Sequence, residues 1–408
     1  MSRPVNNPWL NRFAVLTAVA TFILIGIGGL VTSKGVGMAV PDWPTTYGYN
    51  MFLFPISQWV GGIFYEHTHR LVASIVGTLV VCLTRWLGGK PTRKPLAIIG
   101  MLEILVGIIL LLLDPKLRGA GYFLSGIGVM VLLAALVWVR NEPAGKLLRQ
   151  LGWLAFFTVQ LQGLLGGLRV ILYWDAIGIF HAALAQAFLV LLCAIALFTT
   201  SWWQNLQAKI PAQADRLHLR PVLAAVTALI FAQLLIGATM RHAHAGLSIP
   251  DFPLAYHKLW PPMDAASVAS YNENRVQVSE TNPITAFQIV LQMVHRLTAL
   301  LIVCAVTFCA MRTRRLGSRH PLARWSLFWL ALILCQIVLG AATIWSNKAA
   351  DIATLHVLVG ALSLVTSALL TVTAFRVLIP ARAAVPAAAQ SAPTPFASAK
   401  PVVSAPGH

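Results

Sequence analysis

Long apolar runs separated by polar connections dominate the chain. A membrane-spanning helix needs roughly 20 largely apolar residues, and about ten runs near that length follow one another along the sequence. The runs cover residues 13–33, 67–88, 95–113, 120–140, 151–170, 178–199, 222–240, 289–311, 325–345 and 353–375. The pattern therefore predicts an all-α polytopic membrane protein with about ten transmembrane helices.

Composition and charge fit this class. Hydrophobic residues make up 58% of the chain and charged residues only 10%, whereas soluble domains are about 25% charged. The net charge of +18 does not indicate a nucleic-acid partner, because Lys and Arg gather in alternate connections, at 85–94, 140–149, 209–220 and 312–324. By the positive-inside rule these connections face the cytoplasm. We therefore expect a multi-pass protein of the inner (plasma) membrane, solvated by the lipid bilayer, with both termini cytoplasmic.

Two halves of the chain carry matching motifs. The segment VPDWP at 40–44 matches IPDFP at 249–253, and EHTHRL at 66–71 matches QMVHRL at 292–297. The pattern Q-x-x-[LI]-G recurs at 162–166, 233–237 and 336–340. These matches predict two tandem four-helix bundle repeats, at 13–199 and 222–376, related by a pseudo-twofold axis along the membrane normal.

Two segments fall outside this repeat. The runs at 95–113 and 120–140 contain no histidine and have no counterpart in the second half, so they predict an inserted helical hairpin at 95–140. A hairpin returns the chain to the same side and preserves the orientation of the later helices. The tail at 383–408 is rich in Ala, Pro and Ser, a composition typical of disorder.

Four histidines occupy matched positions: His69 and His181 in the first half, His295 and His356 in the second. Each lies near the outer start of an inward-running helix. Ionisable residues in membrane helices are rare and usually functional, and two facing imidazoles in a bundle are typical axial ligands of a heme. A zinc site is the competing hypothesis, but it needs four close ligands, and no thiolate cluster joins these histidines. The absence of a CxxCH motif indicates that any heme is held noncovalently.

Glu66 distinguishes the two halves. It precedes His69 by three positions and so shares its helix face, whereas its counterpart is Gln292, which cannot ionise. A carboxylate beside one heme could stabilise positive charge or accept a proton, which would leave the second half as an electron-transfer site. The alternative is a helix-start acid favoured by the helix dipole.

Several other residues near the outer ends of the helices have possible roles at or near the heme sites. Four arginines could pair with heme propionates or could snorkel to the interface: Arg70, Arg296, Arg169 and Arg241. Four further histidines are interpreted as surface or loop residues: His67, His242, His244 and His257. Trp43 and Phe252 either anchor at the interface or cover a heme edge.

The duplicated four-helix unit, the PDWP motif, E-x-x-H-R and one histidine in each closing helix resemble the heme A synthase family over residues 13–376. The resemblance implies oxidation of the C8 methyl group of heme O to a formyl group, which gives heme A for cytochrome oxidase. It implies that His295 and His356 ligate the iron of a heme b cofactor and that His69 and His181 flank the substrate heme O. It makes Glu66 the functional carboxylate. Expected partners are heme O synthase and an electron acceptor or quinone.

Two features depart from the family, and two other functions stay open. Many bacterial members have a cysteine pair in the first outer loop, which this chain lacks, and the hairpin at 95–140 exceeds the usual eight helices. A quinol-linked diheme b-type electron-transfer cytochrome would keep all four histidines without needing Glu66. A heme transporter or chaperone would bind one exchangeable heme.

Overall fold

The computed structural model describes residues 7–136, 142–210, 212–274 and 283–380. Within that part, ten helices are long and apolar enough to cross a membrane. They are α1 (Pro8–Ser33), α2 (Gly61–Gly88), α3 (Arg93–Leu113), α4 (Arg118–Leu136), α5 (Lys146–Leu172), α6 (Asp175–Phe198), α9 (Leu219–His242), α11 (Ala286–Arg314), α12 (Pro321–Trp345) and α13 (Ala350–Val377). The predicted fold class is confirmed. The predicted disordered tail at 383–408 lies outside the described residues.

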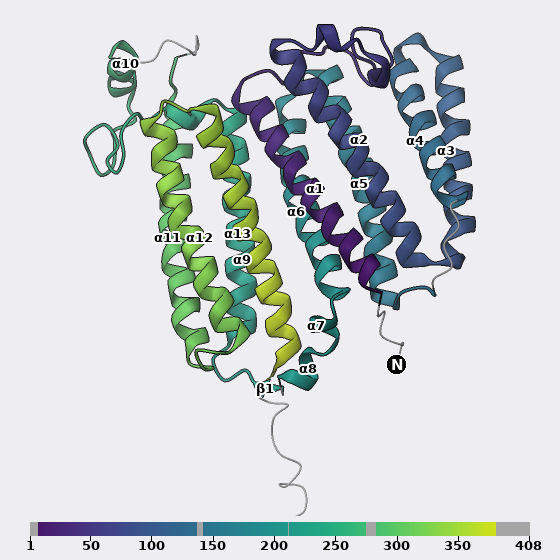
Figure 1. Ribbon diagram of the computed structural model, residues 1–408. Coiled ribbons are helices and arrows are strands. Elements are labelled where there is room, and N and C mark those ends of the chain that lie inside the picture. The colour runs from purple at the N-terminus through teal and green to yellow at the C-terminus, as the bar shows by residue number, and fades with distance from the viewer. Residues whose placement is uncertain (1–6, 137–141, 211, 275–282, 381–408) are drawn as a thin grey trace, which may run out of the picture.

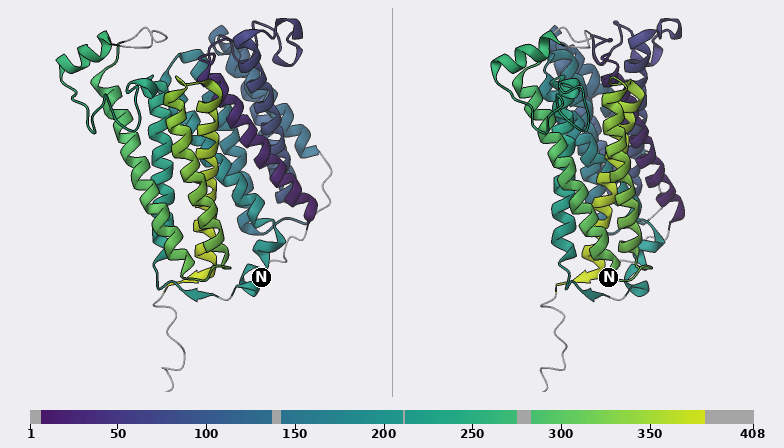
Figure 2. Two further views of the ribbon diagram at one scale, coloured as in Figure 1. Left: turned by 60° about the vertical axis from the view of Figure 1, so that its left-hand side comes forward. Right: turned by 90° about the vertical axis from the view of Figure 1, so that its left-hand side faces the viewer.

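The long helices form two bundles and a separate pair (Figure 1). Helices α1, α2, α5 and α6 pack together, as do α9, α11, α12 and α13, and the bundles meet where α1 and α6 face α9 and α13. Helix α1 begins and α13 ends at the lower end in Figure 1, and Figure 2 shows the same arrangement from two other sides. The first loop (residues 34–60) and the second loop (the described part of 243–285) lie at the opposite end, which we call the loop end.

All ten long helices begin two to six residues before their apolar runs, and two of these differences affect the site. Helix α2 begins at Gly61 rather than at residue 67, and α11 begins at Ala286 rather than at 289. The early part of α2 includes Glu66 and His67, and that of α11 includes Gln288, because both helices extend past the apolar layer into the loops. A capping box between Thr285 and Gln288 stabilises the start of α11. As a result His69 and His295 lie more than two turns into their helices, deeper than the sequence indicates.

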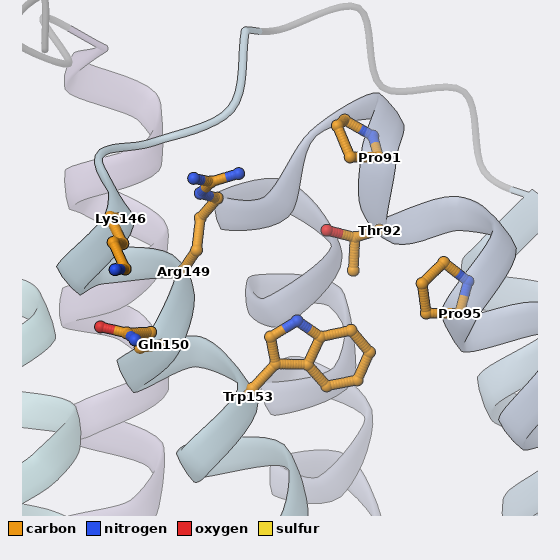
Figure 3. Close-up of a pocket in the computed structure, with 7 residues that line it drawn as sticks. All are labelled: Pro91, Thr92, Pro95, Lys146, Arg149, Gln150 and Trp153. Carbon is orange, nitrogen blue, oxygen red and sulfur yellow. The ribbon is translucent and has the colours of Figure 1, made fainter.

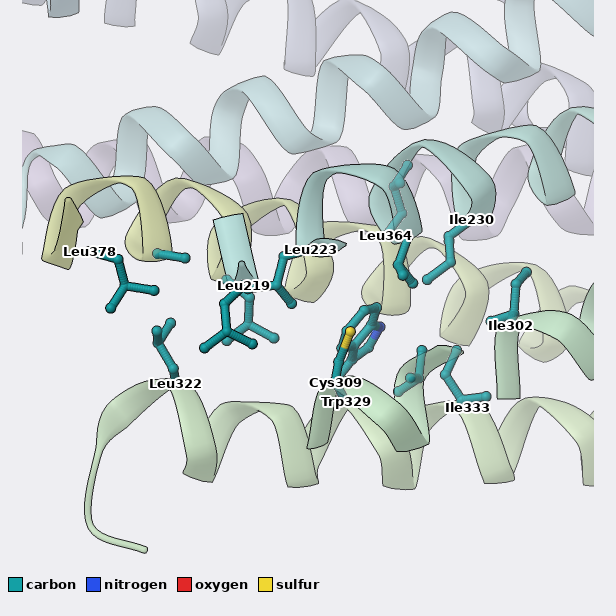
Figure 4. Packing of buried hydrophobic residues seen from close by; sticks show 14 of the residues in the cluster. Leu219, Leu223, Ile230, Ile302, Cys309, Leu322, Trp329, Ile333, Leu364 and Leu378 are labelled. Carbon is teal, nitrogen blue, oxygen red and sulfur yellow. The ribbon is translucent and has the colours of Figure 1, made fainter. Parts of the chain in front are cut away.

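Each bundle has its own apolar core. In the second bundle, Figure 4 shows Trp329 of α12 surrounded by leucine and isoleucine side chains from α9, α11 and α13, among them Leu223, Ile302 and Leu364. Apolar side chains on the outer faces are exposed instead, for example Leu112 at 82%. An exposed leucine of this kind suits a helix solvated by lipid, where no hydrophobic penalty applies.

The inserted hairpin is a tight pair of helices at the edge of the first bundle, away from the second (Figure 1). Glycines let α3 and α4 approach closely: a Cβ added at Gly100 would lie 2.8 Å from the carbonyl oxygen of Gly128, and one at Gly107 equally close to that of Gly121. Small residues at such spacing favour close helix packing in membranes. The hairpin docks on α2 and α5 through a buried cluster that includes Phe156.

Short elements complete the chain. The connection between the bundles contains α7 (Ser201–Gln204), α8 (Leu206–Lys209) and β1 (Gln213–Ala214), and β1 pairs in parallel with β2 (Leu378–Ile379) directly after α13. The second loop contains α10 (Ala265–Glu273). The described residues also form five 3-10 turns: η1 (Met51–Leu53), η2 (Ile56–Gln58), η3 (Lys90–Thr92), η4 (Pro115–Leu117) and η5 (Ala245–Leu247).

Candidate functional site

Each of the four predicted histidines packs its ring against a glycine of a neighbouring helix. The pairs are His69 with Gly28, His181 with Gly166, His295 with Gly237 and His356 with Gly340. A Cβ added at these glycines would lie between 3.0 and 3.4 Å from the nearest ring atom. A larger side chain would therefore compete with the imidazole for the same space at all four positions.

Glutamines of the repeated Q-x-x-[LI]-G motif contact the helices that carry three of these histidines, His181, His295 and His356. The side-chain amide of Gln162 donates to the carbonyl of His181 at 3.2 Å, and that of Gln233 donates to the carbonyl of His295 at 2.9 Å. Gln336 lies against Gly360, one turn after His356. The sequence shows this motif only as a sign of the repeat. In the structure, its glutamine contacts the histidine-bearing helix, and its glycine leaves space for an imidazole ring.

His295 and His356 face each other across the second bundle. Their ring centres are 6.4 Å apart at an interplanar angle of 61°. Metal–imidazole bonds of about 2 Å on each side of an iron, plus the ~1 Å from each ligating nitrogen to its ring centre, would separate the rings by about 6 Å. The Nδ1 atoms are buried and make no hydrogen bond within the described part of the chain. In both rings the Cε1–Nδ1 edge faces the glycine, so that Nε2 is turned away from it. This pair fits the axial ligands of a heme.

The pair in the first bundle differs in ring orientation. His181 places its Cε1–Nδ1 edge on Gly166, as the second-bundle histidines do on their glycines. His69 instead places Nε2 nearest Gly28, at 3.0 Å from the added Cβ. Matching positions in sequence therefore do not give matching ring orientations, and the second bundle is the better prepared for ligation from both sides.

Glu66 and Arg70 bind α2 to the first loop. The carboxylate of Glu66 accepts from the backbone N–H of Val40 at 2.9 Å and from Arg70 at 2.7 Å, and the two side chains are 5% and 10% exposed. Arg70 also donates to three loop carbonyls, those of Val40, Asp42 and Thr45, at 2.6–2.9 Å. A buried carboxylate beside His69 is thereby held on both oxygens.

The second loop is held by equivalent hydrogen bonds, with the neutral amide of Gln292 in place of the Glu66 carboxylate. Gln292 accepts from the N–H of Ile249 at 2.7 Å and from the hydroxyl of Ser248 at 2.8 Å. Arg296 donates to the carbonyls of Asp251 and Leu254 at 2.7 and 2.8 Å. The two units share their shape, so Glu66 adds an ionisable group to an architecture that an amide already satisfies.

The aspartate of each PDxP motif closes its own turn. Asp42 accepts from the N–H groups of Tyr47 and Gly48, both at 2.8 Å, and from the hydroxyl of Thr45 at 2.5 Å. Burial raises the pKa of Asp42, but these hydrogen bonds together hold it below its usual value. Asp251 accepts equivalent backbone bonds in the second loop. Both loops are therefore ordered by their own side chains.

The arginines predicted as propionate partners fall into two groups. Arg70 and Arg296 direct their N–H donors mainly to loop carbonyls. Arg169 and Arg241 lie at the loop end between the bundles, and Arg241 crosses to α1, where it donates to the carbonyl of Gly29 at 2.6 Å and to the hydroxyl of Ser33. Arg169 and Met38 line a cavity of about 160 Å³ with Tyr173 and Trp174.

Two further histidines occupy unexpected places. His67 is fully buried rather than at the surface: its Nδ1 is 3.1 Å from the hydroxyl of Thr46, and its ring packs on Phe54 and Trp59. The interpretation of His67 as a surface histidine is therefore wrong, because the first loop folds over it. His242 lies against Gly178 at the start of α6, where an added Cβ would be 2.4 Å from its ring. It joins Arg169 and Arg241 between the bundles, a position the sequence did not indicate.

A second cavity lies at the other end of the molecule. Its volume is about 250 Å³, and Figure 3 shows its lining: Pro91, Thr92, Pro95, Lys146, Arg149, Gln150 and Trp153. These residues come from η3 and from the first turns of α3 and α5, far from the four histidines. This cavity is therefore separate from the candidate heme sites.

Comparisons with known proteins place the chain in a family. A family model described as cytochrome oxidase assembly protein matches residues 122–369, which include three of the four histidines. The chain is 22% identical over 355 residues to the heme A synthase of Halalkalibacterium halodurans, which covers 86% of this chain and 92% of that protein. It is 28% identical over 222 residues to the heme A synthase of Symbiobacterium thermophilum, which covers 53% and 65%. A shorter match of 101 residues, 34% identical, joins it to the heme A synthase of Shouchella clausii and covers 24% and 32%.

Proposed function

Because the chain belongs to the heme A synthase family of cytochrome oxidase assembly proteins, we propose that it oxidises the C8 methyl group of heme O to the formyl group of heme A. One observation carries the proposal. Two bundles hold histidine pairs over matching glycines, yet only one bundle has an ionisable side chain in the loop-holding position, Glu66 against Gln292. A synthase needs this combination, since one heme is substrate and the other is cofactor.

His295 and His356 would hold the resident heme b. The support is the 6.4 Å between their ring centres and the packing of both rings on glycines by their Cε1–Nδ1 edges. When bound, a bis-histidine heme b supplies one-electron transfer. Gln233 positions the helix of His295 through its backbone carbonyl, and the apolar bundle core around the site keeps water away.

His69 and His181 would flank the substrate heme O. The support is that both rings pack against glycines, Gly28 and Gly166, at positions that match those of the second-bundle pair. Arg169 and Arg241 are propionate candidates because they lie together at the loop end between the bundles, whereas Arg70 and Arg296 lie under the two loops. A cationic cluster at the loop end would orient the heme with its propionates toward water.

Glu66 would handle the charge and protons of the reaction. Balanced with water as the oxygen source, conversion of the methyl to the formyl group releases four electrons and four protons. The electrons need a membrane acceptor such as a quinone, and the protons need an exit to the loop end. Glu66 lies on the helix face of His69 and is held by the N–H of Val40 and by Arg70. A fixed carboxylate there would stabilise positive charge and accept a proton.

The orientation follows from the charges at the two ends. Lys90, Arg93 and Lys146 lie opposite the loop end, as do the start of α1 and the end of α13. We propose that this side is cytoplasmic and that the protein is a multi-pass component of the inner (plasma) membrane, where heme O synthase would deliver the substrate laterally.

Pigment analysis tests the proposed function. The chain is expressed in cells that make heme O but lack another source of heme A, and extracted hemes are separated by chromatography. Heme A in the extract supports a synthase. Two bound b-type hemes without heme A would identify a diheme cytochrome, and a single exchangeable heme would identify a transporter or chaperone; either result overturns the proposal.

A further inference from the structure

The indole of Trp43, in the PDWP motif, is held between the inserted hairpin and the first bundle. Its ring centre is 4.4 Å from that of Phe123 in α4. On the other side it lies on Gly167 of α5, where an added Cβ would be 2.2 Å from the ring. The Trp43 carbonyl oxygen also lies beside Gly119 of α4, 2.6 Å from an added Cβ. The hairpin therefore contacts both the backbone and the side chain of this residue.

The hairpin is itself fixed to the first bundle. The Phe123 ring lies over Gly163 of α5, 2.9 Å from an added Cβ. Lower in the membrane, Gln160 of α5 donates to Glu103 of α3 at 2.7 Å. A hydrogen bond at this depth has little competition from water. Contacts at two depths, one through α4 and one through α3, thus keep the hairpin in place beside the first bundle.

Trp43 lies in the part of the first loop that binds Glu66. Val40, three positions before Trp43, donates its N–H to the Glu66 carboxylate. Arg70, the ion-pair partner of Glu66, donates to the carbonyl of Asp42, directly before Trp43. A displacement of Trp43 would therefore move the two groups that fix the carboxylate.

The second loop shows the same motif without a hairpin. Phe252 takes the position of Trp43 and, by alignment of the repeated Q-x-x-[LI]-G motif, Ala341 takes that of Gly167. Phe252 packs within its own bundle, with its ring centre 6.2 Å from Trp345 and 5.6 Å from the Arg296 guanidinium. In the second loop a smaller aromatic, Phe252, therefore corresponds to Trp43, and a larger residue, Ala341, corresponds to Gly167. In the first loop Trp43 and Gly167 are joined by a third residue, Phe123 of the hairpin.

We infer that the inserted hairpin is a positioning element for the Glu66 half of the molecule: Phe123 and Gly119 hold Trp43, and through it the loop amide that orients the Glu66 carboxylate. The inference rests on the proposed function where it concerns activity. It assigns no part to the hairpin in the His295–His356 site.

Amide hydrogen exchange of Phe123→Ala tests the positioning without any need for activity. Exchange in the first loop, at 38–50, should become roughly tenfold faster or more, because local opening exposes the Val40 and Tyr47 amides. Exchange in the second loop, at 247–258, should stay as in the wild type. Tyr122→Ala is the matched control, since that neighbouring side chain is 54% exposed, and Phe123→Tyr should restore slow exchange. Gly167→Ala, which displaces Trp43 without altering the hairpin, should reproduce the effect.

The yield of heme A provides the second readout. Phe123→Ala should lower it about ten- to a hundredfold, as expected for a misplaced reacting group, while the heme b spectrum is unchanged. Unchanged exchange in the first loop would overturn the inference, and so would faster exchange with wild-type heme A yield. If the wild type makes no heme A, the proposed function fails, and the exchange measurement still decides whether the hairpin holds the loop.

Discussion

Glu66→Gln separates the charge of this side chain from its shape. The second loop shows that an amide fits the position, because Gln292 accepts the N–H of Ile249 just as Glu66 accepts that of Val40. The substitution should therefore preserve the bond to the loop backbone. It removes the ion pair with Arg70 and the ability to accept a proton.

The loss of folding stability in Glu66→Gln can be estimated from the contacts that the substitution removes. A hydrogen bond to a charged group contributes about 1.5–3 kcal/mol, and an unpaired buried charge costs about 3–5 kcal/mol. Arg70 keeps its three carbonyl acceptors, so we expect a loss at the low end, about 1–2 kcal/mol. If Glu66 stabilises charge or accepts a proton, the rate should fall by about two to four orders of magnitude, which corresponds to about 3–5 kcal/mol in the barrier.

The assay is chromatography of hemes extracted from cells that make heme O and contain wild-type amounts of the variant. Heme b should persist, and heme O or a hydroxylated intermediate should accumulate. Asp42→Asn is the control for a loosened loop, since it weakens the turn at Tyr47 and Gly48 but leaves the Glu66 carboxylate; its yield should fall less than that of Glu66→Gln. Heme A at wild-type yield from Glu66→Gln would refute the role of the carboxylate.

Three further outcomes are expected. Gln233→Leu should retain the heme b spectrum but lower the thermal stability of the heme b site by about 0.6–1.7 kcal/mol, the range for interhelical hydrogen bonds in membranes. Gln162→Leu, in the other bundle, should leave the stability of the heme b site unchanged. The hydrogen bonds that lower the pKa of Asp42 should make the wild type more stable than Asp42→Asn above the unfolded-state pKa of about 3.9, and differential melting should show that advantage lost as the pH falls through the lower folded-state value. A cysteine introduced at Lys116, in the turn between α3 and α4, should react with an impermeant maleimide added outside the cell; labelling from the inside alone would contradict the orientation.

Much of the fold follows from hydropathy alone. The bilayer imposes a length on every spanning segment, so apolar runs predict the ten long helices. The helix starts are predicted two to six residues late because the helices continue past the apolar layer, where hydropathy carries no signal. The inserted hairpin is recognisable because it interrupts a repeat, but its role is not.

The candidate site is predictable in its residues and not in its contacts. Repeat position and depth identify His69, His181, His295 and His356, but not the rotated ring of His69, since a rotamer depends on packing rather than on sequence spacing. The sequence suggests propionates for Arg70 and Arg296, whereas the structure places their guanidinium groups on loop carbonyls. The contact between Trp43 and Phe123 joins segments far apart in the chain, and no local pattern encodes it.

The heme content of the purified double variant His69→Ala/His181→Ala, made in cells that synthesise heme O, tests the division between substrate and cofactor sites most directly. The account predicts a wild-type amount of heme b with its low-spin spectrum, held by His295 and His356, and no bound heme O or heme A. Loss of heme b from this variant, or retention of heme O or heme A at wild-type levels, would contradict it.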